Sequence, residues 1–225
     1  MESIGIEINP KAESVSDKTD LSSFHKMNLG CGVNLVRDYL NIGYWSELTD
    51  GTVYKDIDGN IGTYMLNYDL TKGLPVPDES QQVIYHSHFL EHVSYKEGIK
   101  LLSDIYKKLL PGGIHRIVVP DMELWIKSYY EKNDFFINKY REEVLSEDIE
   151  IYKPRGAAFM GMLHNHGHKC GWDYEMLAFH LQNIGFKSIN RMMYQETNFL
   201  QSDMTILEPY APLRAMESLC VECVK

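Results

Sequence analysis

Six of the nine histidines lie in two short segments of the chain, and their spacing is the first indication of chemistry. They are His86, His88 and His92 in one segment, and His164, His166 and His168 in the other. A histidine beside a reacting group can take the proton from an attacking hydroxyl or amine, because its pKa lies close to neutral. A carboxylate can do the same, and Asp121 directly follows a segment with the pattern of a strand. The predicted candidates for a catalytic base are therefore His88, His92, His166 and Asp121.

The same histidines could instead bind a metal ion. His164, His166 and His168 alternate, so on an extended segment they would project to one side, where His88 or Asp121 could complete the set of ligands. A divalent ion at such a site would bind and acidify a hydroxyl. No cysteine or clustered aspartate accompanies these histidines, so the sequence leaves the metal unknown.

Structural roles are the alternative for several of these side chains. His92 can be a buried, hydrogen-bonded histidine at the start of a helix. His180 lies on the apolar stripe of a predicted helix and is expected in the core. Residues 88–92 also match the H-x-x-E-H pattern of one metalloprotease class. That pattern requires a long helix, and here it follows a strand, which disfavours a protease.

Two glycines, Gly30 and Gly32, follow the first predicted strand in the segment M-N-L-G-C-G. Glycines in this place let a ligand approach the backbone, and a following helix start offers free N–H groups. A dinucleotide fingerprint needs a further glycine at position 35, where this chain has Leu35. The residues therefore disfavour a nicotinamide cofactor and favour a ligand without a pyrophosphate, such as S-adenosylmethionine.

Asp69 lies at the end of the third predicted strand. Ligands of a doubly wound sheet bind outside the carboxyl ends of its strands, so this carboxylate can accept a hydrogen bond from an adenine amino group. The alternative is a solvated turn residue ahead of Gly73 and Pro75.

The elements that position these residues alternate between strands and helices, which predicts a doubly wound α/β domain. We expect a mostly parallel seven-stranded sheet whose last strand runs antiparallel. Its strands are expected near residues 24–29, 39–42, 63–70, 82–85, 114–119, 186–193 and 219–224, and helices at 98–110 and 173–184. Residues 1–22 are expected to form an N-terminal arm, 23–225 a single domain, 50–62 a loop and about 122–162 a helical insert.

Composition excludes several classes of function. A net charge of −10 without a basic run disfavours binding to nucleic acid, which needs a basic surface. No apolar stretch approaches the roughly 18 residues that cross a bilayer, so we expect a cytoplasmic protein without a membrane span. The four cysteines are too few and too scattered for a disulfide framework.

Several short motifs occur in a specific order along the chain. They are N-L-G-C-G at 28–32, D-L at 69–70, L-P-V-P-D at 74–78, V-I-Y-H-S-H-F-L-E-H-V at 83–93, L-P-G-G at 110–113 and V-P-D at 119–121. Together they resemble the small class I S-adenosylmethionine-dependent methyltransferases found beside polysaccharide-synthesis and glycosyltransferase genes. The resemblance covers about residues 25–125 and resumes from His168 to the closing strand.

The resemblance implies that the loop with Gly30 and Gly32, here called the glycine loop, holds the methionine part of S-adenosylmethionine. It also implies that Asp69 and Leu70 flank the adenine and that residues 86–87 lie beside the sulfonium. The cofactor-binding residues predicted in this way are Asn28, Gly30, Cys31, Gly32, Asp69, Leu70, His86 and Ser87. Similar sequences usually carry an acid after the second strand to hold the ribose hydroxyls, where this chain has Gly43. Tyr44, Glu47 or a backbone group would have to replace it.

We therefore expect a methyltransferase that acts on an oxygen of a small molecule, most simply a saccharide or a precursor of a cell-surface (capsular) polysaccharide. This substrate rests on the resemblance alone. A divalent metal is a further candidate cofactor, and a homodimer is a candidate assembly. Two alternatives remain open: a non-catalytic partner subunit that keeps the fold, and a nicotinamide-dependent oxidoreductase, which Leu35 disfavours.

Overall fold

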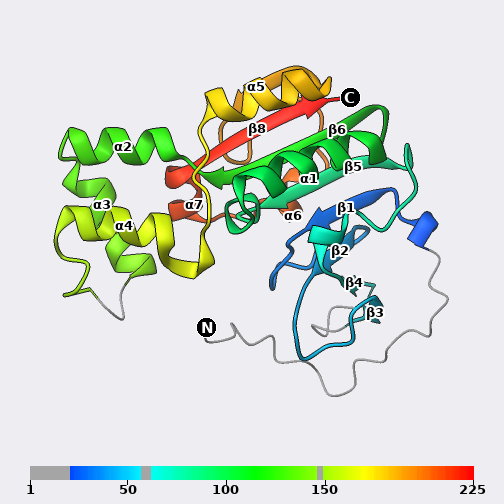
Figure 1. Ribbon diagram of the computed structural model, residues 1–225, viewed down its shortest axis with the longest axis horizontal. Helices are drawn as coiled ribbons and strands as arrows, with labels where there is room; N and C mark the ends of the chain where they lie inside the picture. The colour runs from blue at the N-terminus through cyan, green and yellow to red at the C-terminus, as the bar shows by residue number, and fades with distance from the viewer. Residues whose placement is uncertain (1–20, 57–61, 146–148) are drawn as a thin grey trace.

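A computed structural model describes residues 21–56, 62–145 and 149–225, and these residues form an α/β structure around one eight-stranded sheet (Figure 1). The strand order is β3-β4-β2-β1-β5-β6-β8-β7. The bounds are β1 Lys26–Leu29, β2 Leu40–Gly43, β3 Thr52–Lys55, β4 Tyr64–Asn67, β5 Gln81–Ser87, β6 Leu109–Pro120, β7 Lys187–Met192 and β8 Ser218–Val224. Strands β4, β2, β1, β5 and β6 pair in parallel, whereas β3 pairs antiparallel with β4 and β8 antiparallel with both β6 and β7.

The predicted mostly parallel sheet with an antiparallel last strand is confirmed. The sheet has eight strands rather than seven because β3 lies inside the segment that we expected to be a loop. The four residues of β3, T-V-Y-K, are β-branched, aromatic and long side chains that suit a strand. Their run is short and is surrounded by Asp and Gly, which hid its pattern in the sequence.

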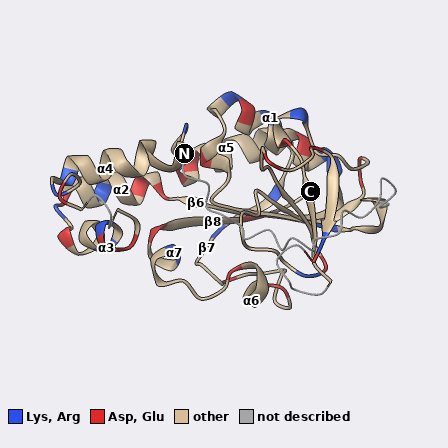
Figure 2. Ribbon diagram, turned by 90° about the horizontal axis from the view of Figure 1, so that it is seen from below, with Lys and Arg blue, Asp and Glu red and all other residues tan. Residues whose placement is uncertain are grey.

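One face of the sheet is covered by two long helices, α1 (Tyr95–Lys108) and α5 (Tyr174–Ile184) (Figure 2). A capping box between Ser94 and Glu97 begins α1. Asp173 caps the first turn of α5, and Gly185 follows its last turn at φ 120°. These helices bury Leu102 and Leu177 in the largest hydrophobic core, which also contains the fully buried Trp172.

Helix α1 ends earlier than the sequence predicted. Its last residue is Lys108, and β6 begins at Leu109, so the L-P-G-G segment lies within the strand and does not end the helix. Gly112 takes a positive φ of 81° there, and its N–H bonds the carbonyl of Lys225 at the end of the chain.

Of the described helices, the other face of the sheet carries two short ones, α6 (Met204–Leu207) and α7 (Pro212–Glu217), with the segments beside them (Figure 2). A second, smaller core lies on this side and includes Tyr85, Val118 and Leu207. No helix connects β1 to β2, because the interval between these strands is short. The connection between β1 and β2 therefore consists of turns.

Three helices extend beyond the carboxyl end of β6 as a separate layer (Figure 1). They are α2 (Met122–Tyr130), α3 (Asp134–Val144) and α4 (Arg155–His164). They pack around their own core, in which the fully buried ring of Trp125 meets Phe136 and Tyr140 edge-on. The predicted N-terminal arm lies outside the described residues except for its last two positions. No helix in the described part of the chain is long and apolar enough to cross a membrane.

Candidate active site

The carboxyl ends of β1, β2, β4 and β5 meet at one edge of the sheet. Their register pairs Leu29 with both Ile42 and His86, and Ile42 with Leu66. The loops that follow these strands therefore begin side by side, although they are far apart in the sequence. This is the edge at which doubly wound sheets bind their ligands.

Two asparagines hold the glycine loop after β1. Asn28 is buried, and its amide donates to the carbonyl of Asn34 and to the side chain of Asn41, each at 2.9 Å. Asn41, also buried, accepts from the N–H of Val36 and donates to the carbonyls of Val36 and Tyr39. The side chain of Asn28 thus holds the backbone of the glycine loop by hydrogen bonds. Asn41 holds the same loop, and the sequence analysis did not identify it.

Gly30 and Gly32 both have positive φ values, 61° and 49°. A Cβ on Gly30 would lie 2.4 Å from the ring of Phe89, so this aromatic side chain packs directly against the loop. A Cβ on Gly32 would meet no atom within 4 Å. The loop is therefore covered at its first glycine and open at its second.

An aromatic ring also covers the end of β2. A Cβ on Gly43 would lie 2.2 Å from the ring of Trp45 and 3.1 Å from the Sγ of Cys31. Cys31 is buried, and burial raises the pKa of its thiol to about 12. The side chains of Trp45 and Phe89 are two further parts of this edge that the sequence analysis did not identify. In the sequence Trp45 lies two positions after Gly43, whereas Phe89 has no glycine near it and reaches Gly30 only through the pairing of β1 with β5.

Asp69 follows β4 and caps the short turn Leu70–Lys72. Its Oδ1 accepts from the N–H and the hydroxyl of Thr71, at 3.0 and 2.7 Å, and these bonds lower the pKa of the carboxyl. The side chain is half-buried at the same edge as the glycine loop, whereas that of Leu70 is buried in the core. The structure shows the turn role of Asp69, and its contact with an adenine stays a prediction.

The side chain of His86 lies in the core rather than at the edge. It is fully buried, 5.2 Å from the ring of His115 between centroids, and burial lowers its pKa to about 3. Only the backbone of His86 can therefore meet a bound ligand. Ser87, the next residue, is half-buried at the end of β5.

Beyond Ser87 lies a polar cluster formed by His88, Glu91, His92, His168 and Ser218. His88 Nε2 lies 2.9 Å from the hydroxyl of Ser218, and His88 Nδ1 lies 3.3 Å from Glu91 Oε1. The rings of His92 and His168 meet edge-on at 4.8 Å between centroids. Three segments thus meet here: the loop after β5, the segment after α4 and the first residue of β8.

The electrostatics of the polar cluster are dominated by burial. Desolvation lowers the pKa of both His88 and His92 and raises that of the Glu91 carboxyl. A second buried carboxyl, Glu217, is raised to a pKa of about 7 by burial, although Arg214 opposes this shift. His88 and His92 are therefore mainly neutral at neutral pH, and a neutral imidazole can accept a proton or bind a metal.

Asp121 is placed by two structural contacts. Its Oδ1 caps α2 by accepting from the N–H of Leu124 at 3.2 Å, and its Oδ2 pairs with Arg191 at 2.5 Å. Burial raises the pKa of this carboxyl, while the Leu124 N–H and the Arg191 guanidinium lower it. Its side chain is only 4% exposed, so Asp121 is held mainly as an anchor between β6, α2 and β7.

The second histidine segment is not extended, as the predicted alternation required. Residues Asn165–Gly167 form a turn of 3₁₀ helix in which His166 has a positive φ of 59°. His164 and His166 are exposed, and only His168 faces the polar cluster. The expected grouping of all three histidines on one side is therefore wrong, because the turn rotates two of them outward.

Comparison with known proteins bears on the fold. No protein-family model matches this chain, and no curated protein sequence matches it. Its structure is similar to that of an S-adenosylmethionine-dependent methyltransferase from Archaeoglobus fulgidus, with a TM-score of 0.51 at 15% identity over 89% of this chain and 85% of that chain. The fold is that of the class I methyltransferases. An S-adenosylmethionine-dependent methyltransferase from Thermotoga maritima matches with a TM-score of 0.51 at 15% identity, over 89% of this chain and 82% of that chain.

Glu91 is the member of the polar cluster that the sequence analysis left without a role. Its position was marked by the H-x-x-E-H spacing of residues 88–92, which we set aside because the segment follows a strand. The structure agrees with that context, since Leu90–His92 form a single turn of 3₁₀ helix. Ser218 and Arg191 carried no motif, and only the pairing of β8 and β7 brings them to this edge.

Proposed function

We propose that this protein is an S-adenosylmethionine-dependent methyltransferase that transfers the methyl group to an oxygen atom. One observation carries the proposal. The glycine loop, Asp69 and the part of the polar cluster from His88 to His92 follow strands that end at a single edge of a sheet with the class I methyltransferase fold. A cofactor at the glycine loop would lie next to titratable groups that can act on an acceptor.

One feature of the glycine loop, the open space at Gly32, fits the binding of S-adenosylmethionine. Gly32 faces open space at a positive φ, so the backbone there leaves room for a ligand that a side chain would fill. We assign the loop Gly30, Cys31 and Gly32 to the methionine part and Asp69 with Leu70 to the adenine. Asn28 acts through the loop, and residues 86–87 offer their backbone.

The cofactor supplies a methyl group already activated on a sulfonium, which leaves alignment and proton removal to the protein. Of the four candidate bases, we assign proton removal to His92 in the metal-free protein. Its side chain is 35% exposed and its pKa is lowered by burial, so a neutral imidazole is accessible to an acceptor. His88 uses both nitrogens within the polar cluster, Asp121 is held by Arg191, and His166 is exposed away from the cluster.

For the acceptor we propose a hydroxyl or acidic oxygen of a saccharide or a polysaccharide precursor. The sequence motifs support this class, and the acidic chain disfavours nucleic acid. The test is transfer of label from methyl-labelled S-adenosylmethionine to a panel of monosaccharides, sugar phosphates and nucleotide sugars. A labelled sugar that disappears with His92→Ala, by roughly 10²–10⁴-fold in turnover, would support the proposal. Label in none of these acceptors, with cofactor binding intact, would remove the saccharide class.

One observation favours the alternative of a non-catalytic partner subunit. The rings of Phe89 and Trp45 lie against Gly30 and Gly43, where a cofactor would approach the backbone. In an active enzyme these rings must turn aside when the cofactor binds. If they stay in place, the fold lacks a cofactor site, and the protein would show no binding of S-adenosylmethionine.

A further inference from the structure

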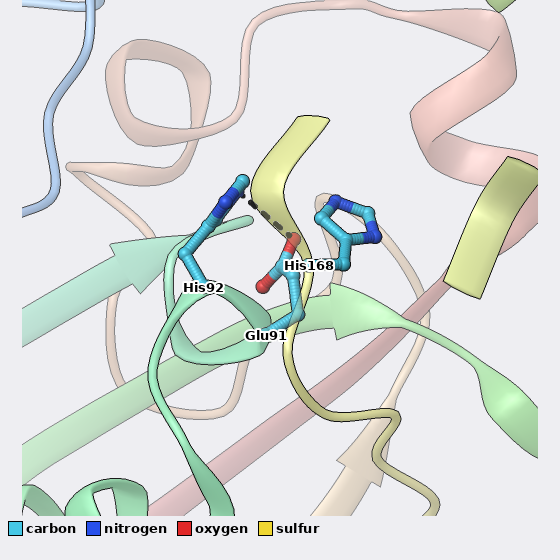
Figure 3. A group of neighbouring side chains, drawn as sticks. All are labelled: Glu91, His92 and His168. Carbon is cyan, nitrogen blue, oxygen red and sulfur yellow. Dashed lines mark ion pairs between the residues drawn. The ribbon is translucent and has the colours of Figure 1, made fainter. Parts of the chain in front are cut away.

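Glu91, His92 and His168 bring three donor atoms together at the centre of the polar cluster. One ligand atom from each residue lies within 4.8 Å of the other two. Figure 3 shows the Glu91 carboxylate between the two imidazole rings, with His92 and Glu91 coming from the turn after β5 and His168 from the segment after α4. His92 Nε2 lies 4.0 Å from Glu91 Oε1.

One of the two imidazoles is oriented by a main-chain carbonyl. His168 Nδ1 lies 2.6 Å from the carbonyl of Met162, and this contact makes Nδ1 the protonated nitrogen and leaves the lone pair on Nε2. A carbonyl that fixes the tautomer from behind is the usual outer support of a histidine that binds a metal.

Glu91 is the second, independent observation. Its side chain is 2% exposed, and neither carboxylate oxygen accepts a hydrogen bond in the part of the chain that the structure describes, although His88 Nδ1 lies 3.3 Å from Oε1. The backbone of Glu91 is firmly held, because its carbonyl accepts from the N–H groups of Lys169 and Cys170. A buried carboxylate that accepts no hydrogen bond is costly, and coordination of a cation would compensate that cost.

A small cavity adjoins two of the three donor residues. Glu91 and His168 line it together with Met162, Leu163 and Cys170. Two histidines and one carboxylate with an open position form a common set for a metal ion that binds a water or a substrate oxygen.

We propose that Glu91, His92 and His168 bind one divalent transition-metal ion, with zinc the best match to these nitrogen and oxygen donors. Zinc binds such ligands at about 2.0–2.2 Å in a tetrahedron, so the donor atoms would lie about 3.4 Å apart. The present separations therefore need only side-chain adjustments of about 1 Å or less. Asp121 and the exposed His164 and His166 are not ligands.

The site does not depend on the proposed methyl transfer, but its use in catalysis does. With a metal bound, His92 is a ligand rather than a base. The ion would then bind the acceptor hydroxyl and lower its pKa, as a Lewis acid does.

The experiment is titration of chelator-treated protein with zinc by calorimetry, together with the visible absorption of cobalt(II) in the same protein. We expect one ion per chain, and at least a tenfold loss of affinity in both His168→Asn and Glu91→Gln. The matched controls are His164→Asn, an exposed histidine on the same segment, and Glu217→Gln, a second buried carboxyl. Both controls should bind zinc as the unchanged protein does.

Zinc binding that is absent, or equal in His168→Asn and in the unchanged protein, would overturn the proposal. Equal loss in His164→Asn would also overturn it, because the ion would then sit on the exposed histidines. If Glu91→Gln fails to fold, His168→Asn and the cobalt spectrum still decide. Binding of S-adenosylhomocysteine, measured on the same samples, separates a failure of the metal site from a failure of the methyltransferase proposal.

Discussion

Acid should destabilise this protein through a pair of buried histidines. His86 on β5 and His115 on β6 are both fully buried, and none of their ring nitrogens has a hydrogen-bond partner among the described residues. Burial lowers the pKa of His86 to about 3 and also lowers that of His115. In the unfolded chain a histidine titrates near about 6.5, so below that pH the unfolded state binds more protons than the folded state.

The size of the effect follows from this difference in pKa. Between about pH 8 and pH 5, one histidine with a folded pKa of about 3 lowers the free energy of unfolding by about 2 kcal/mol. His115 adds a loss of the same sign. Glu217 acts in the opposite direction, because its pKa is raised to about 7 and the folded state gains its proton first as the pH falls. A single variant must therefore isolate the histidine contribution.

The perturbation is His86→Phe, which keeps a ring in the core and removes the titrating group. Urea unfolding followed by tryptophan fluorescence gives the free energy of unfolding at about pH 8 and pH 5. We expect the unchanged protein to lose about 2 kcal/mol more than the variant over this interval. The control is His164→Gln, which removes an exposed histidine. A difference below roughly 0.5 kcal/mol between the unchanged protein and His86→Phe would refute the reasoning.

Three further predictions test other parts of the structure. Arg116→Met removes the guanidinium that lies 2.8 Å from the fully buried carboxylate of Glu208. The free energy of unfolding, measured in urea, should fall by about 3–5 kcal/mol. A loss under roughly 1 kcal/mol would contradict a stabilising role of this buried pair. Gly30→Ala should lower the free energy of unfolding by at least about 1–2 kcal/mol, because Gly30 has a positive φ and the new methyl group would contact Phe89. In the double variant, Phe89→Ala should restore part of that loss. Additive losses would show that the ring does not cover the loop. Asp69→Ala should weaken S-adenosylhomocysteine binding in calorimetry with about 1 kcal/mol or less of lost stability, and unchanged binding would mean that the adenine lies elsewhere.

Much of the fold was predictable because strand and helix patterns are local. Asp173 and the turn glycine Gly185 mark the ends of α5 in the sequence, and the structure places α5 accordingly. Helix α1 begins at Tyr95, three residues before its predicted start at Gly98, because Ser94 caps it. β3 was missed because a four-residue strand gives too short a pattern among turn residues. The end of α1 was placed too late because Pro111 and Gly112 also fit the bent start of a strand.

Site residues could be predicted from the sequence only where they directly follow a strand. Gly30 and Gly32 follow β1 as expected, but the ring of Phe89 reaches Gly30 only through the pairing of β1 with β5. Alternation in the sequence suggested that His164 and His166 would face the same way as His168, and a turn with a positive φ overrides that pattern. Contacts of this kind depend on tertiary structure, so a single sequence does not carry them.

The measurement that tests the central claim most directly is calorimetric titration of the purified protein with S-adenosylhomocysteine. The account predicts binding with micromolar affinity and one ligand per chain. It also predicts that tryptophan fluorescence changes on binding, because the ring of Trp45 must leave the end of β2. No binding at any accessible concentration would contradict the claim and would identify this chain as a methyltransferase fold without methyltransferase activity.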